Sequence, residues 1–222
     1  MDINVSEVSK SFKTRSGKVL EVLKGLNIEV PSGSILKLEG ASGSGKTTLM
    51  NILSGLIMPD EGKIEIGDID ISTLSEVEKD RFRAENIGYI FQTFNLLSPF
   101  SVIENVYAPA AFSGKLKKDH KEKAMEILNQ VGLKGFEKSM PYHLSVGQRQ
   151  RVAVARVLFS ENRIILADEP TASLDKISSK SVFDSLMKCR EFGATIIFAS
   201  HDEVFREISP DRTVSLDEGG AQ

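Results

Sequence analysis

The stretch Gly40-Ala-Ser-Gly-Ser-Gly-Lys-Thr-Thr48 is a glycine-rich loop that ends in a lysine and two hydroxyl residues. Apolar residues dominate 35–39 just before it, which predicts a buried strand, and 47–56 after it has the apolar spacing of a helix. A plain glycine-rich turn is the simpler interpretation of such a loop. Its position between a strand and a helix favours a phosphate-binding P-loop instead.

The residue types of this loop predict its ligand. Glycines let backbone N–H groups approach phosphate oxygens closely, and the start of the following helix adds the positive end of its dipole. Lys46 is expected to place its ammonium between the β- and γ-phosphates, and Thr47 to offer a hydroxyl to Mg²⁺. The sequence therefore predicts that the chain binds a nucleoside triphosphate with Mg²⁺.

Composition limits the other classes of function. The chain has 222 residues and a net charge of −3, with acidic and basic residues interspersed, which indicates one domain and no nucleic-acid partner. The single cysteine, Cys189, excludes an internal disulfide and suits a reducing compartment. Neither a signal peptide nor an apolar run of membrane-spanning length occurs. We expect a soluble cytoplasmic protein that reaches a membrane only through a partner.

The segment before the P-loop predicts an antiparallel sheet. Strand-like apolar runs at 3–12 and 19–30 are separated by a polar turn. Phe12 lies in or just after the first strand, where its ring offers a flat face for an adenine base. A phenylalanine in the core or at a strand edge is the alternative, and the pattern alone favours it. Two alternating runs at 63–66 and 68–71 predict a further hairpin.

A strand over 87–91 delivers Gln92 to its carboxyl end, where ligands of open α/β sheets bind. Capping-box signatures start helices after Ser75 and Ser101, and a charged amphipathic helix is expected over 117–131. Residues 93–147 therefore read as a helical insert. The opening of this insert, 93–100, is apolar, which indicates either a partner surface or burial against the insert itself.

The segment Leu144-Ser-Val-Gly-Gln148 has two interpretations. Ser145 and Gln148 form a capping box for a helix over 149–160, which alone accounts for both residue types. The same geometry leaves a helix N-terminus beside Gly147 exposed, where phosphate can bind. Spacing alone leaves the choice open.

Two later strands also end next to side chains that are suited to catalysis or ligand binding. The strand 163–168 ends in Asp168 and Glu169, which in a P-loop protein suit the magnesium shell and the attacking water. Asp175 is a plausible N-cap for the helix 176–190, and this does not exclude contact with nucleotide.

The strand 194–199 leads to His201. Ser200 and Glu203 have the spacing of a capping box, so His201 is either a first-turn residue or a hydrogen-bond donor to a γ-phosphate.

The order of these motifs resembles the ATP-binding cassette (ABC) family over essentially the whole chain. The sequences of 91–97, 104–106 and 167–171 are similar to those of one branch of the family. Members of that branch work with membrane subunits in lipoprotein extraction, export of drugs and peptides, or force transmission to the cell envelope. By resemblance, 40–48 is Walker A, Gln92 the Q-loop, 144–148 the signature, 164–169 Walker B, 172–175 the D-loop and His201 the switch histidine. The resemblance also favours adenine stacking on Phe12.

The resemblance implies a single α/β domain with a P-loop NTPase (RecA-like) core, an N-terminal antiparallel β subdomain and an inserted α-helical subdomain. We expect the core with its β subdomain to comprise 1–92 and 148–222, and the helical subdomain to comprise 93–147. The ATP-binding residues implied are Phe12, Gly40, Ala41, Ser42, Gly43, Ser44, Gly45, Lys46, Thr47, Thr48 and Gln92. Those implied for catalysis are Lys46, Glu169 and His201, and those implied for Mg²⁺, partly through water, are Thr47, Gln92 and Asp168.

The resemblance further implies a head-to-tail dimer of two copies that sandwich ATP. Ser145, Gly147, Gln148 and Asp175 of one copy would complete the site that the other copy's Walker A begins. An integral membrane permease subunit is the expected second partner, and the chain would lie on the inner face of the membrane through it. One departure is Val146, which stands where the signature usually has its first glycine. A β-branched residue there is expected to weaken the closed dimer or slow turnover.

Two other classes share part of the pattern. An ATP-driven clamp that acts on DNA or ribosomes typically carries a long coiled-coil insert or two cassettes in one chain, and neither fits this sequence. In a P-loop kinase or GTPase, 144–148 would be only a capped helix. No Asn-Lys-x-Asp guanine motif occurs, so this class is also disfavoured.

Overall fold

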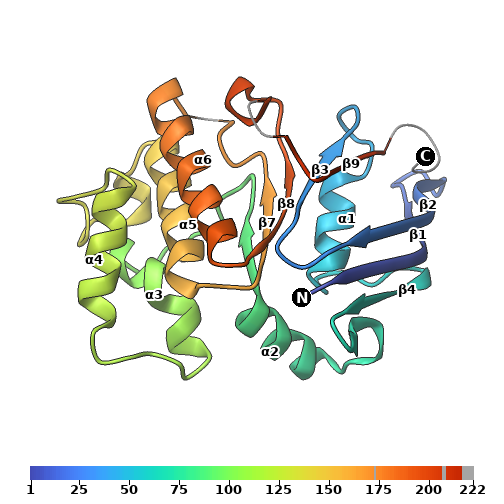
Figure 1. Ribbon diagram of the computed structural model, residues 1–222, viewed down its shortest axis with the longest axis horizontal. Coiled ribbons are helices and arrows are strands. Elements are labelled where there is room, and N and C mark those ends of the chain that lie inside the picture. The colour runs from blue at the N-terminus through green and yellow to red at the C-terminus, as the bar shows by residue number, and fades with distance from the viewer. Residues whose placement is uncertain (173, 207–208, 217–222) are drawn as a thin grey trace.

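The computed structural model describes residues 1–172, 174–206 and 209–216. Ser173 of the expected D-loop and the expected polar tail at 217–222 lie outside the described residues. Figure 1 shows an antiparallel sheet on one side, a parallel sheet in the middle and a group of helices on the other side.

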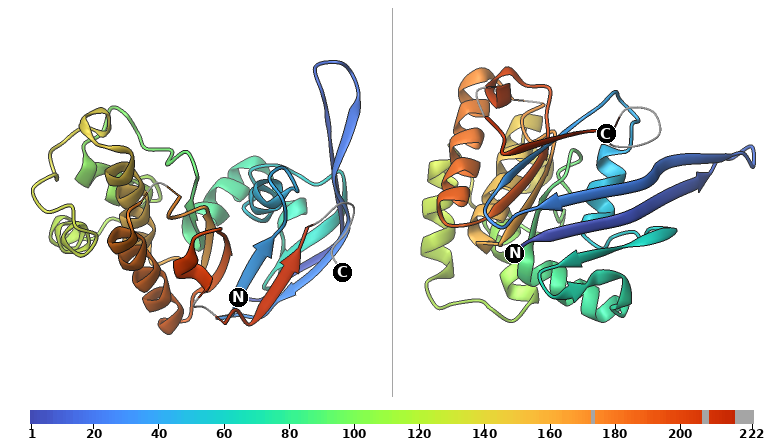
Figure 2. Two further views of the ribbon diagram at one scale, coloured as in Figure 1. Left: turned by 90° about the horizontal axis from the view of Figure 1, so that it is seen from above. Right: turned by 45° about the vertical axis from the view of Figure 1, so that its right-hand side comes forward.

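The antiparallel sheet has the strand order β2-β1-β4-β5, which confirms the expectation for the N-terminal segment. Its strands are β1 (Ile3–Lys13), β2 (Val19–Val30), β4 (Glu61–Ile66) and β5 (Ile69–Asp70). The outer part of the β1–β2 hairpin extends away from the body as a two-stranded arm (Figure 2).

The parallel sheet has the strand order β6-β7-β8-β3-β9, and each neighbouring pair in it is parallel. Its strands are β3 (Ile35–Glu39), β6 (Ile87–Ile90), β7 (Ile164–Asp168), β8 (Thr195–Ala199) and β9 (Arg212–Ser215). All residues of β6, β7 and β8 are buried, as expected of strands covered on both faces. Their carboxyl ends meet at one edge of the sheet, which is where the fold places ligands.

The parallel sheet separates two hydrophobic cores. Leu36 and Leu38 of β3 join the core shared with the antiparallel sheet and the P-loop helix, whereas Ile35 joins the core shared with the other helices. The same alternation occurs in β8, where Ile197 faces the first core and Phe198 the second. This period of two is what a strand packed on both faces requires.

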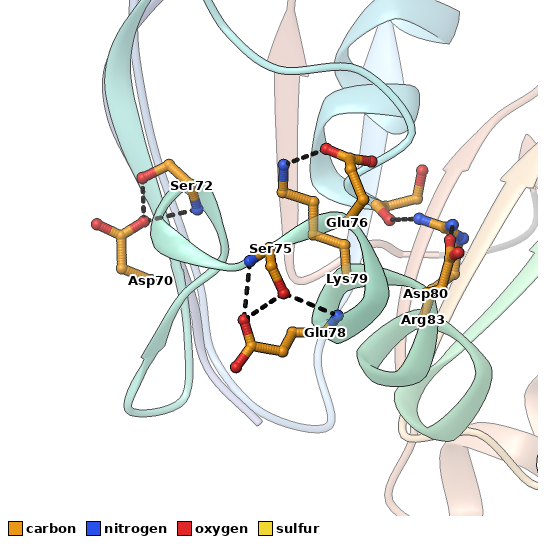
Figure 3. Close-up of polar contacts among 9 residues, drawn as sticks. Asp70, Ser72, Ser75, Glu76, Glu78, Lys79, Asp80 and Arg83 are labelled. Carbon is orange, nitrogen blue, oxygen red and sulfur yellow. Dashed lines mark hydrogen bonds and ion pairs between the residues drawn. The ribbon is translucent and has the colours of Figure 1, made fainter.

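Local capping sets where most helices begin. The serines before α2, α3 and α5 each form the expected capping box, and Figure 3 shows that of Ser75 and Glu78. Asp175 caps the last long helix by accepting a hydrogen bond from Ser178 N. The α-helices are α1 (Lys46–Leu53), α2 (Glu76–Asn86), α3 (Val102–Phe112), α4 (His120–Gln130), α5 (Val146–Ser160) and α6 (Lys176–Glu191).

One expected cap is wrong. Ser200 Oγ accepts a hydrogen bond from Asp202 N at 3.2 Å, and Asp202 Oδ1 accepts one from Val204 N at 3.1 Å. Asp202 therefore caps this segment in place of the expected Ser200 and Glu203 pair. Its short side chain reaches the backbone N–H two residues further along. The helix that follows is a single 3₁₀ turn, Glu203–Arg206.

Asn105 of α3 fixes the loop that opens the helical region. Its side chain is fully buried and donates to the carbonyls of Leu97, Phe100 and Ser101 at 3.0–3.1 Å, while its Oδ1 accepts from Leu97 N at 2.7 Å. Within the same loop Leu96 packs against the helical core, whereas Leu97 is 36% exposed. The apolar opening at 93–100 is therefore partly buried and partly on the surface.

Asn105→Leu replaces this side chain with an apolar one of similar size. We expect the free energy of unfolding to fall by about 3 kcal/mol, because buried backbone groups lose their hydrogen-bond partners. Chemical denaturation measures this, with Asn129→Leu on the exposed face of α4 as a matched control expected to change stability little. Equal effects of the two substitutions would contradict the role of Asn105.

Candidate nucleotide-binding site

The P-loop lies between β3 and α1, and its glycines adopt backbone angles that other residues rarely reach. The φ angles of Gly40, Gly43 and Gly45 are 139°, 85° and 101°. A Cβ on Gly45 would lie 2.9 Å from Leu23 Cδ2 and 3.0 Å from Val22 Cγ1, so only glycine fits at the N-cap of α1. The loop therefore presents the N-terminus of α1 without an intervening side chain.

Lys46, the first residue of α1, folds back over this loop. Its Nζ donates to the carbonyls of Gly40 at 2.6 Å and Ala41 at 2.9 Å. An ammonium next to a helix N-terminus adds positive charge to that of the helix dipole, which favours binding of a polyphosphate there.

Thr47 and Asp168 connect the P-loop helix to β7. Thr47 Oγ1 donates to Asp168 Oδ2 at 2.6 Å, and the Asp168 carboxylate is buried at the end of its strand. A hydroxyl and a carboxylate side by side are oxygen ligands of the kind that Mg²⁺ prefers. No group of three or more His, Cys, Asp or Glu residues among those described suits a metal ion by itself. Mg²⁺ at this place therefore fits as an ion that also takes oxygens from phosphate and water.

Glu169 and His201 face each other at the ends of β7 and β8. His201 Nε2 lies 3.7 Å from Glu169 Oε1, and the backbone N–H of His201 donates to Glu169 Oε2 at 3.4 Å. Glu169 has a φ of 48° and its N–H donates to Ala199 O at 2.9 Å, which fixes this unusual backbone next to β8. The expected acid and histidine therefore share one corner of the sheet edge.

A cleft of about 730 Å³ joins these groups and has the size of a small-molecule site. Phe12 also lines the cleft and is 40% exposed, so it is not a core phenylalanine. It pairs with β2 only, so it does lie at a strand edge, the other part of the alternative that the pattern favoured. The lining includes these of the expected site residues: Phe12, Ser42, Gly43, Gly45, Lys46, Thr47, Thr48, Gln92, Asp168, Glu169 and His201.

Seven expected site residues do not line this cleft: Gly40, Ala41 and Ser44 of the P-loop, and Ser145, Gly147, Gln148 and Asp175. Ser145 and Gln148 cap α5 through bonds of 2.9 Å and 3.3 Å, with Gly147 between them. Asp175 caps α6, and its bonds from Ser178 hold the pKa of its carboxyl below the ordinary value. One chain therefore gathers the P-loop, the acids and the histidine, and leaves the Ser145–Gln148 helix start apart from them.

Sequence reasoning missed the grip of α5 on the loop after Gln92. Arg156 Nη1 donates to Asn95 O at 2.8 Å and its Nη2 to Phe94 O at 3.1 Å, while the Arg149 guanidinium lies 5.8 Å from the Phe94 ring centre. Burial lowers the pKa of Arg156 to about 10. Phe94 and Asn95 have φ angles of 65° and 46°, so the grip holds a strained turn. The spacing of seven places Arg149 and Arg156 on one face of α5, but no local signal points from them to the loop.

A second missed contact ties α5 to the segment after the acid pair. The side chain of Gln150 is buried and donates to Pro170 O at 2.7 Å. The helix that begins at Val146 thus touches both the turn after Gln92 and the turn after Glu169.

Together these features define a P-loop nucleoside triphosphatase. Residues 23–172 match the family model described as "ABC transporter", and the chain belongs to the ABC transporter family. It is an ATPase of the ATP-binding cassette type, as the resemblance implied.

The relatives agree with this assignment. The chain is 39% identical over 218 residues to the lipoprotein-releasing system ATP-binding protein LolD of Bacteroides fragilis, and the match covers 98% of each chain. It is 40% identical over 217 residues to the macrolide export ATP-binding/permease protein MacB of Campylobacter fetus, which covers 98% of this chain and 34% of that one. The ATP-binding cassette MJ0796, solved as a dimer bound to ADP and Pi, matches with a TM-score of 0.92 and 34% identity. The match covers 99% of this chain and 96% of that one.

Arg156→Lys keeps the positive charge but removes the two-pronged donor that holds Phe94 and Asn95. We expect amide hydrogen exchange over 92–97 to become at least ~10-fold faster, because lysine does not reproduce the guanidinium geometry. Mass spectrometry of exchanged peptides measures this.

Arg151→Lys is the matched control for that substitution. Arg151 of the same helix donates to the carbonyls of Val131 and Gly132, both at 3.3 Å, so its loss should affect 131–133 and leave 92–97 unchanged. Unchanged exchange over 92–97 in Arg156→Lys would show that the grip does not hold the loop.

Proposed function

We propose that the chain is the ATP-binding and ATP-hydrolysing subunit of a transporter whose membrane-spanning part is a separate permease subunit. The observation that carries this proposal is the gathering of the P-loop, the acid pair and His201 around one cleft at the carboxyl edge of the parallel sheet. Among the described helices, none is long and apolar enough to cross a bilayer.

Within the cleft each side chain has a distinct role in the proposal. The base of ATP stacks on Phe12, and the phosphates lie against the loop 40–48 with Lys46 beside the β- and γ-phosphates. Thr47, Asp168 and Gln92 would hold Mg²⁺, partly through water, and the ion would supply positive charge against the phosphates. The Thr47–Asp168 contact supports this, since it places two oxygen ligands together at the start of α1.

Glu169 acts on the attacking water. Its carboxylate accepts a proton as the water approaches the γ-phosphate, and His201 donates a hydrogen bond to that phosphate. The proximity of the two side chains at the strand ends supports this assignment.

Two copies of the chain assemble head to tail in this proposal. Ser145, Gly147, Gln148 and Asp175 do not line the cleft of their own chain, so a second copy is what brings them to an ATP. The dimeric state of MJ0796 supports such an arrangement. The boundaries 1–92 with 148–222 for the core and 93–147 for the helical subdomain remain part of the proposal.

The membrane partner follows from the relatives. LolD is named as the ATP-binding protein of a lipoprotein-releasing system, and MacB carries a permease in the same protein. We propose a permease of that type as the partner. This chain would then lie on the cytoplasmic face of the membrane, and the permease would bind the cargo. ATP-driven closure of the dimer would then power lipoprotein release, export or force transmission to the envelope.

Glu169→Gln tests the catalytic assignment. We expect hydrolysis at least ~100-fold slower with ATP affinity retained, because the amide does not accept the proton. Phosphate release and equilibrium nucleotide binding measure the two effects. Glu203→Gln, at an exposed glutamate near His201, is the control expected to hydrolyse ATP normally. Normal turnover in the Glu169 variant would remove that residue from the proposed role.

Val146→Gly tests the departure in the signature. Val146 is the first residue of α5 and is 44% exposed, so its branched side chain stands where a phosphate of the second copy's ATP would approach. We expect a higher maximal rate of hydrolysis by about threefold, since glycine opens the helix start. Val77→Gly in the first turn of α2 controls for loss of helix stability. A lower rate in Val146→Gly would mean that valine suits the site.

A further inference from the structure

Asp60 lies in the turn between α1 and β4, and it grips the strand that carries Phe12. Its Oδ1 accepts a bond from Lys10 Nζ at 2.6 Å, and its Oδ2 accepts one from Ser11 N at 2.7 Å. The backbone N–H of Asp60 also donates to Ser9 O at 2.9 Å. All three contacts fall on the residues just before Phe12.

The grip coincides with a place where β1 has little other support. The pairing of β1 with β4 runs only to Ser9 opposite Glu61, and the pairing with β2 shifts register between Lys10 and Ser11. Beyond this place β1 continues as part of the two-stranded arm (Figure 2). A two-stranded ribbon is only marginally stable by itself, so a contact at its base has a large influence on where its side chains lie.

Phe12 is the first arm residue beyond this grip. It faces Leu20 across the hairpin and lines the cleft together with Val22 and the P-loop. Lys10 Nζ lies 5.6 Å from the centre of the Phe12 ring, so the cation that Asp60 holds also contacts the ring. The hydrogen bonds from Lys10 and Ser11 hold the pKa of Asp60 below its ordinary value.

We propose that Asp60 is a positioning residue for nucleotide binding, which sets the height of the Phe12 ring above the P-loop by clamping Lys10 and Ser11. This proposal rests on the proposed stacking of the ATP base on Phe12. Asp60 itself does not line the cleft. We therefore expect its effect to fall on the base, because the loop 40–48 and α1 hold the phosphates in the proposed site.

The experiment compares ligands with and without a base. Dissociation constants for ATP and for tripolyphosphate are measured on the full chain by calorimetry, for Phe12→Ala, Asp60→Ala, Asp60→Asn and Lys10→Met. Loss of a base-stacking ring is expected to weaken ATP binding about tenfold in Phe12→Ala, and loss of the clamp about fivefold in Asp60→Ala. Tripolyphosphate affinity should stay unchanged in both variants, because neither substitution alters the phosphate-binding loop.

Intermediate substitutions grade the effect. Asp60→Asn keeps an acceptor for Ser11 N and loses the ion pair, and Lys10→Met keeps the Ser11 bond, so both should weaken ATP binding less than Asp60→Ala. They also test the clamp if Asp60→Ala folds poorly. The double variant Phe12→Ala, Asp60→Ala should bind ATP no more weakly than Phe12→Ala alone, because Asp60 acts through the ring.

A matched control removes a similar ion pair elsewhere in the same sheet. Lys63 Nζ lies 2.9 Å from Glu65 Oε1 on β4, so Glu65→Gln should leave ATP affinity unchanged. A drop in ATP affinity in Phe12→Ala without one in the Asp60 variants would overturn the clamp and leave the stacking intact. Unchanged ATP affinity in Phe12→Ala would overturn the stacking and the clamp with it. Equal weakening of tripolyphosphate in Asp60→Ala would also overturn the clamp.

Discussion

The hydrogen bond from Thr47 to Asp168 joins the first turn of the P-loop helix to the end of a central strand. The rest of the site depends on this junction, because it fixes the loop that holds phosphates relative to the strand end that carries Glu169. The bond is short at 2.6 Å and its acceptor is buried, so the two elements meet in one defined geometry. The ligands of an ion and the residue that acts on water are thereby placed on the same edge.

The helix α5 links the remaining parts of the molecule. Its first turn carries the Ser145 cap, Gln150 bonds to the turn after Glu169, and Arg156 grips the turn after Gln92. A displacement of this helix therefore acts on the segments that follow both β6 and β7, which each contribute residues to the cleft. Two hydrogen bonds from Arg156 help to hold the strained turn at Phe94 and Asn95, which makes this place sensitive to any such displacement.

Short-range signals in the sequence were sufficient for most of the fold. The P-loop, the capping boxes at Ser75, Ser101 and Ser145, and the apolar runs of the parallel strands all rest on neighbours within a few residues, and the structure has them as expected. The cap expected from Ser200 to Glu203 failed because Asp202 competes over an even shorter range. Contacts such as Arg156 with Asn95 or Asp60 with Lys10 join residues about 50 to 60 positions apart, so no local pattern shows them.

In the proposed dimer the cleft of one chain is half of an ATP site, which a second copy completes. Light scattering on Glu169→Gln protein with Mg²⁺, with and without ATP, tests it most directly. We expect a mass near 24.4 kDa without ATP and about twice that with ATP. When Ser145→Arg is added, ATP should still bind but the mass should not double. A mass that does not respond to saturating ATP, or a dimer that forms regardless of Ser145, would contradict it.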